Sequence, residues 1–164
     1  MNDDFKEEDL DREAAVQLSG DRANRFYDRL RASVRGYVSG LGGAVEKTSE
    51  FLLLVPDVFI LLWRLINDPR VNGKNKVLLG GGVAYYILPI DLLPEAFLGP
   101  LGYLDDLVFG VYVLNRMLTD TEPQILREHW SGTIDVLEMI QRVLAAADSL
   151  VNKQVLDRIR RMTK

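Results

Sequence analysis

The sequence predicts an all-α fold, a single helical bundle built around a central apolar helical hairpin. Residues 77–118 form an apolar run, a turn and a second apolar run. Apolar residues in other segments recur at spacings of three and four, as on the buried face of a helix, and no stretch alternates as a strand does. The chain has 164 residues, 48% hydrophobic and 27% charged, so it is long enough for one domain with a sizeable core.

The first 20 residues are expected to form an acidic polar tail, followed by a single helical domain over residues 21–164. Residues 1–13 contain seven acids against two bases, a composition typical of a solvated, disordered segment. This stretch lacks the apolar core of a secretory signal. The chain has no cysteine, which excludes disulfides, thiolate catalysis and zinc sites with cysteine ligands.

Residues 21–40 are predicted to form a basic amphipathic helix, with Asp21 as its cap. Its apolar positions include Tyr27, Leu30 and Val34, and arginines occupy the other faces. Such a helix either lies on an anionic membrane surface or packs in a bundle with a solvated arginine face, and both interpretations stay open. The candidate membrane or partner surface comprises Arg22, Arg25, Arg29, Arg31 and Arg35.

The hairpin, with the helix before it, is expected over about residues 56–118. A helix over 44–67 should be interrupted, or should restart, at Pro56. The hairpin arms are expected at 76–88 and 99–118. The uncharged run from Val77 to Ile90 would span about 21 Å as a helix, which is less than the roughly 30 Å core of a bilayer. Its three glycines, Gly80 to Gly82, favour close helix packing.

The C-terminal third is predicted to hold a turn at 119–123, a short helix through His129 and a long helix that begins at Ser131 or Thr133. Apolar residues keep a three-four spacing over two heptads and then slip in phase. Bundle packing and a helical dimer both fit this pattern, so the C-terminal helix is a candidate surface for a homo-oligomer.

Four carboxylates gather at the bend of the hairpin, and oxygen ligands of this kind suit hard divalent cations. Helix capping by the same acids is the alternative interpretation, and it is favoured by the residues alone. A divalent cation is the only cofactor that the sequence suggests. The candidate metal ligands are Asp91, Glu95, Asp105 and Asp106.

Other chemical functions find little support. His129 is the single histidine, and a packing or solvent role is expected for it rather than catalysis. No phosphate-binding loop or nucleophile elbow occurs. A sequence pI of about 5.1 argues against nucleic-acid binding. The acids lack a histidine or lysine partner nearby, so no acid–base set is complete and an enzymatic activity is not expected.

The segment PIDLLPEAFLGPLGYLDD at residues 89–106 resembles the YkvA-like family, a small and mostly bacterial domain of unknown function. That family usually carries aspartate where this chain has Glu95. The resemblance implies a helical hairpin that is membrane-associated, with no settled activity and no catalytic residues. The matching positions are Tyr85, Tyr86, Pro89, Ile90, Asp91, Pro94, Gly102, Tyr103, Asp105 and Asp106.

These observations predict a membrane-associated helical scaffold or interaction protein, whose partner is membrane lipid or a membrane protein. Bases flank the hairpin at the ends away from the acids, which by the positive-inside rule places both ends on the cytoplasmic side. The alternative is a soluble helical bundle that binds a divalent cation or a partner protein through the acidic bend. A metal-dependent enzyme would need a nucleophile or base that the sequence does not supply.

Overall fold

The computed structural model describes the backbone of residues 4–40, 46–92 and 100–164, and the side chains of residues 20–40, 49–84 and 104–164. Within these ranges all the regular structure is helical, which confirms the all-α prediction. The helices are α1 (Asp4–Gly40), α2 (Glu46–Ile66), α3 (Gly73–Leu92), α4 (Pro100–Met117), α5 (Pro123–His129), α6 (Val136–Leu150) and α7 (Lys153–Met162).

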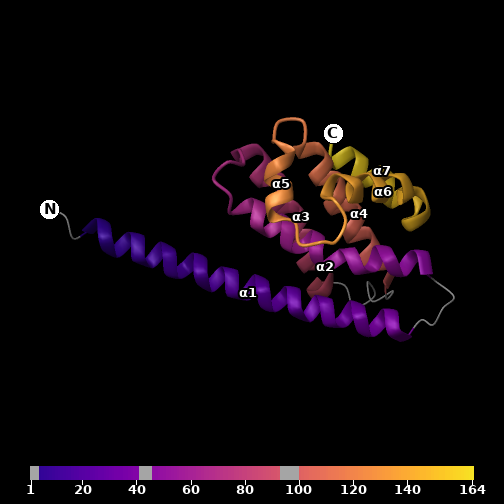
Figure 1. Cartoon of the computed structure of the whole chain (residues 1–164), viewed down its shortest axis with the longest axis horizontal. Coiled ribbons are helices and arrows are strands. Elements are labelled where there is room, and N and C mark those ends of the chain that lie inside the picture. Colours follow the sequence, from indigo (N-terminus) through magenta and orange to yellow (C-terminus); the bar gives the residue numbers. More distant parts are fainter. Residues whose placement is uncertain (1–3, 41–45, 93–99) are drawn as a thin grey trace.

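Helices α2 and α4 lie at the centre of the bundle (Figure 1). α2 packs against α1, α3, α4 and α5, whereas α4 packs against α2, α3, α6 and α7. The predicted hairpin arms α3 and α4 also pack against each other. The core is therefore shared by the hairpin and α2, and its largest fully buried side chains include Leu61, Leu65, Leu107, Leu114 and Met139. Burial of each such side chain contributes about 1.5–3 kcal/mol.

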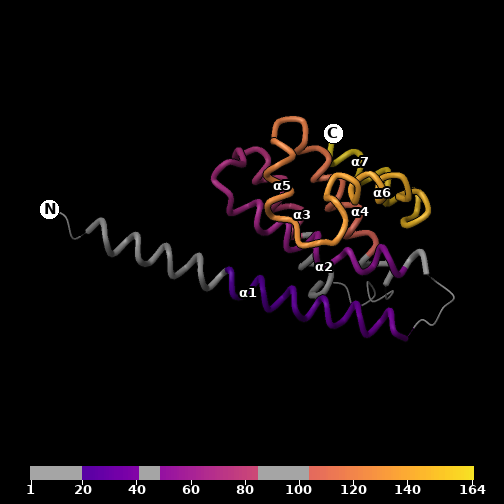
Figure 2. Tube along the Cα trace, in the orientation of Figure 1, coloured from indigo at the N-terminus to yellow at the C-terminus, as the bar shows by residue number. Residues whose placement is uncertain are grey.

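Helix α1 begins at Asp4 rather than at Asp21 and continues without a break to Gly40. Its residues 20–40 lie along α2 (Figure 2). Leu30 and Val34 are buried in the core, and the Tyr27 hydroxyl donates a hydrogen bond of 3.0 Å to Asp57 on α2. The predicted helix is thus found, but its start is wrong, and the domain boundary at residue 20 stays a prediction.

Proline 56 lies inside α2, so the predicted interruption at this residue is wrong. A proline in a helix interior removes one backbone hydrogen bond and costs roughly 3 kcal/mol. Pro56 is itself buried, and its neighbours Val55 and Val58 have no exposed surface. Tertiary packing of this apolar segment therefore outweighs the local preference for a helix end.

Only the last of the three α3 glycines allows a close helix approach. A methyl group added at Gly82 would lie 3.3 Å from the Leu62 side chain of α2 and within 4.0 Å of Phe109 and Val113 of α4. Gly80 and Gly81 have open space at the same position. Gly82 therefore allows α3 to pack closely against both central helices, so the close packing predicted for the glycine run holds at Gly82 but not at Gly80 or Gly81.

The predicted long C-terminal helix is two helices, α6 and α7, separated at Val151 and Asn152. The side chain of Asn152 caps α7 by accepting hydrogen bonds from the backbone N–H groups of Gln154 and Val155. The phase slip in the apolar pattern marks this break. Across the part of the chain described above, no helix combines the length and apolar character that a membrane crossing requires.

Candidate functional site

The structure describes two of the four predicted acidic residues. Asp105 and Asp106 lie in the second turn of α4, where Asp105 is half-buried and Asp106 is only 6% exposed. Asp91 belongs to the backbone of α3, but its side chain and the whole of Glu95 lie outside the described residues. The predicted convergence of all four carboxylates therefore stays a prediction.

Burial gives both α4 carboxyl groups unusual protonation behaviour. Loss of hydration raises the pKa of Asp105 to about 6. Burial, and then the charge of Asp105, raise the pKa of Asp106 to about 8. Because the charged form of a buried acid is poorly hydrated, the protonated form of Asp106 is favoured. Within the described side chains, no group of three or more potential ligands could hold a metal ion.

The five predicted arginines line two separate grooves. Arg22, Arg25 and Arg29 line a groove of about 410 Å³ between α1 and α2. Arg31 and Arg35 lie on the other side of α1, in a separate groove of about 180 Å³. The Arg31 guanidinium also lies 6.0 Å from the centre of the Tyr27 ring, within reach of a cation–π interaction.

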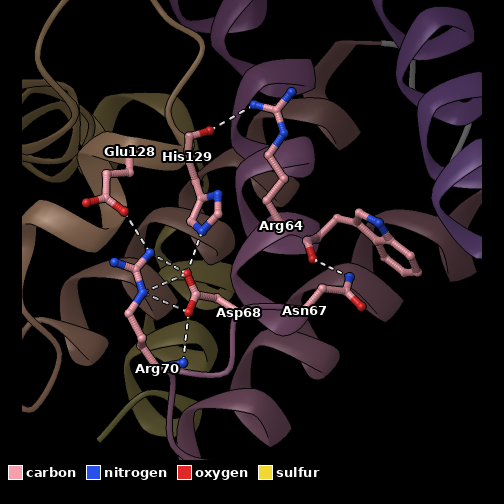
Figure 3. Close-up of polar contacts among 7 residues, drawn as sticks. Arg64, Asn67, Asp68, Arg70, Glu128 and His129 are labelled. Atoms are coloured by element: carbon pink, nitrogen blue, oxygen red, sulfur yellow. Dashed lines mark hydrogen bonds and ion pairs between the residues drawn. The ribbon is translucent and has the colours of Figure 1, made fainter. Parts of the chain in front are cut away.

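A second polar cluster, which the sequence did not predict, surrounds Asp68 in the loop between α2 and α3 (Figure 3). The Asp68 carboxylate accepts hydrogen bonds from the Arg70 guanidinium, at 2.7 Å for Nη2, and from the Arg70 backbone N–H at 2.8 Å. It also lies 2.7 Å from His129 Nε2 on α5. The Arg70 guanidinium continues to Glu128 at 2.7 Å, so the cluster joins the loop to α5.

The partners of Asp68 determine its protonation state. Asp68 is 5% exposed, yet the hydrogen bonds from Arg70, together with that from His129, hold its pKa well below the usual range. Nearby, Arg64 of α2 donates a hydrogen bond of 2.9 Å to the His129 carbonyl oxygen and another to the Ser131 hydroxyl. The Ser131 hydroxyl therefore accepts a hydrogen bond from the charged guanidinium group of Arg64. This arrangement makes the cluster a structural clamp and gives His129 a structural partner.

Sequence reasoning missed this clamp because Asp68 and His129 are 61 positions apart. The only local signal was the pair of opposite charges at Asp68 and Arg70 beside Pro69. In the structure this segment lies in the loop between α2 and α3. Contacts between distant loops depend on how the helices pack, which a single sequence does not reveal.

Comparisons with known proteins identify the central segment. Residues 75–110 match the model of a family described as protein of unknown function (DUF1232). Over 44 residues the chain is 39% identical to the uncharacterized membrane protein YkvA of Bacillus subtilis (strain 168), which covers 27% of this chain and 41% of that protein. Over 99 residues it is 21% identical to the uncharacterized protein ORF9 of Methanothermobacter thermautotrophicus. This match covers 60% of this chain and 66% of ORF9. No solved structure matches the chain.

The chain thus spans less than half of YkvA and just under two thirds of ORF9. The family match lies inside the predicted range of 56–118 and includes all four acids of the bend. It does not include the arginines of α1 or the Asp68 clamp. Residues 75–110 are therefore a YkvA-like segment of unknown function, as their Pro, Asp and Gly-Tyr motif predicted.

Proposed function

We propose that this protein is a helical scaffold or interaction protein bound to the cytoplasmic surface of a membrane. The observation that carries the proposal concerns the large hydrophobic side chains that are most exposed among the described residues, Leu53, Val77 and Met162. Each of them lines a groove together with at least two basic side chains. Apolar contact beside cations is the combination that holds proteins at anionic lipid surfaces.

The first of these grooves lies between α3, α4 and α7. Val77, which is 79% exposed, and Met162 line its apolar part, and the basic side chains are Lys74, Arg116 and Lys164. The groove also contains Asp120, whose side chain accepts a hydrogen bond from Asn75. The three cations exceed this single acid, so the groove keeps a positive charge that favours anionic lipid.

The second groove places Leu53 of α2, which is 45% exposed, beside Arg31 and Arg35 of α1. Asp57 also lines it and accepts the Tyr27 hydrogen bond. The relative YkvA of Bacillus subtilis is described as a membrane protein, which also supports the proposal. Attachment at the surface is favoured over crossing, since the apolar arms are short.

Vesicle flotation tests this function. We expect the full chain to float with vesicles of mixed anionic and neutral phospholipid and to stay behind with neutral vesicles. Each basic residue near an anionic surface contributes about 1 kcal/mol, so the combined variant Lys74→Gln, Arg116→Gln, Lys164→Gln should bind about 100-fold more weakly. The matched control Arg142→Gln, Arg158→Gln, Arg161→Gln removes three charges elsewhere and should still float. Absence of the wild-type chain from anionic vesicles would overturn the proposal.

A second function, binding of a divalent cation at the acidic bend, is favoured by Asp106. A buried carboxylate with a neighbouring carboxylate is stabilised by a hard cation. At pH 8, magnesium, calcium or manganese ions should then raise the melting temperature of the wild type. The shift should disappear in Asp105→Asn, Asp106→Asn and persist in Asp148→Asn, Asp157→Asn. A shift that survives the first pair of substitutions would exclude these two residues as ligands.

A further inference from the structure

The groove of about 410 Å³ between α1 and α2 differs from the two grooves just described, because its floor is aromatic. Phe26 of α1 and Phe59 of α2 contact each other there, with ring centres 4.6 Å apart and the rings tilted by 53°. Trp63 of α2, which is half-buried, continues the same surface. The volume of the groove between α1 and α2 lies within the range of small-ligand pockets, roughly 300–1,000 Å³.

Three cations border this aromatic floor. Arg22, Arg25 and Arg29 follow one another at spacings of three and four, so they lie on the same side of α1, and all three are exposed. Over residues 20–40, 49–84 and 104–164, no ion pair or hydrogen bond engages their guanidinium groups. No carboxylate is among the residues that line the groove. The positive charge is therefore available to a ligand.

We infer that this groove binds one molecule of an anionic membrane lipid, with its headgroup phosphate at Arg22, Arg25 and Arg29 and an acyl chain along Phe26, Phe59 and Trp63. Guanidinium groups bind phosphate oxygens through paired, charge-assisted hydrogen bonds. The aromatic floor supplies apolar contact for a hydrocarbon chain. This site deepens the membrane proposal and rests on it for the source of the ligand.

Trp63 gives a direct readout of the groove. The chain has two tryptophans, so Trp130→Phe leaves Trp63 as the only one. In this background, dodecyl phosphate below its critical micelle concentration should change the fluorescence of Trp63 and saturate at one molecule per chain. Neutral dodecyl maltoside and inorganic phosphate should each bind at least tenfold more weakly, because each provides only half of the interaction. Calorimetry of the wild type should give the same stoichiometry.

The arginines are tested by Arg22→Gln, Arg25→Gln, Arg29→Gln, which should weaken the binding of dodecyl phosphate at least tenfold. The charge-matched variant Arg142→Gln, Arg158→Gln, Arg161→Gln should bind it as the wild type does, and circular dichroism should find unchanged helix content in both. Unsaturable binding, equal affinity for the neutral detergent, or equal loss in the two variants would overturn the inference.

Flotation of the same proteins separates this inference from the membrane proposal. If the wild type floats with anionic vesicles but dodecyl phosphate does not bind in a saturable manner, the lipid groove is overturned and the membrane proposal stands. If dodecyl phosphate saturates the groove and the chain does not float, the membrane as source of the ligand is overturned. Saturable binding together with flotation, both weakened in the Arg22, Arg25 and Arg29 variant, supports the inference.

Discussion

Two buried aspartates of this bundle, Asp68 and Asp106, are exposed by 5% and 6%, and their pKa values shift in opposite directions. Asp68 accepts hydrogen bonds from the cation of Arg70 and lies next to His129, so its charged form is stabilised. Asp106 lies next to another acid, Asp105, and burial favours its neutral form. Burial alone therefore does not decide the state of a carboxyl group. At similar burial the partners do, and they separate an acid held in its charged form from one held in its neutral form.

The largest expected effect is at the clamp. Replacement Asp68→Asn should lower the free energy of unfolding by about 3 kcal/mol, because it breaks a buried charge network. Urea unfolding at pH 7, followed by circular dichroism, measures this loss. The exposed pair of Arg142 and Glu138 provides the control, since Glu138→Gln should cost less than about 0.5 kcal/mol. Equal costs for the two variants would remove the contrast between Asp68 and an ordinary surface acid.

The next effect depends on pH. The folded pKa of Asp106, about 8, lies above its unfolded value of 3.8, so between these values the folded state binds more protons. The free energy of unfolding should therefore fall as pH rises from 5 to 8. Asp106→Asn cannot ionise, and its stability should fall less over the same range. Asp105, with a folded pKa of about 6, leaves a smaller slope in this variant.

Urea unfolding at pH 5, 6, 7 and 8 measures both slopes. Asp148→Asn, which changes an exposed aspartate, should keep the wild-type slope. Asp68→Asn should keep it too, because Asp68 is ionised in both the folded and the unfolded chain between pH 5 and 8. Its lowered pKa changes the stability only below its unfolded pKa of 3.8, where the stabilising contribution is lost. A wild-type slope in Asp106→Asn would mean that another group causes the pH dependence.

The smallest effect concerns His129. Replacement His129→Gln removes one hydrogen bond to Asp68 but leaves Arg70 in place, so it should cost about 1 kcal/mol. A double-mutant cycle with Asp68→Asn measures the coupling, and the combined loss should be smaller than the sum of the single losses. Additive losses would show that His129 stabilises the bundle through other contacts.

The features that the sequence predicted well are local. The existence of the two hairpin arms, the turn after Met117 and the short helix that ends at His129 follow from apolar spacing and from Gly, Pro and Asp signals. The bounds of the first arm were wrong, since α3 extends over Gly73–Leu92 rather than over 76–88. The acids Asp105 and Asp106 were selected from their motif, and in the structure Asp106 is buried and Asp105 is half-buried.

The features that the sequence did not predict depend on how the helices pack together or on one helix-capping residue. Pro56 reads as a helix start, and only its burial explains why α2 continues through it. The break between α6 and α7 was not predicted, although the apolar pattern slips in phase there, and Asn152 caps the start of α7. The division of five arginines between two grooves requires the position of α2, which packs along the face of α1 between them.

Helix α1 packs chiefly against α2, whereas the other long helices have several neighbours (Figure 1). Its release would break the Phe26–Phe59 contact and the Tyr27–Asp57 hydrogen bond and leave the packing of α2 against α4 intact. An element with few contacts opens more often than the core around it. The residence time of any molecule held between α1 and α2 would then be set by how often α1 dissociates from α2. Amide hydrogen exchange along α1 would report that rate.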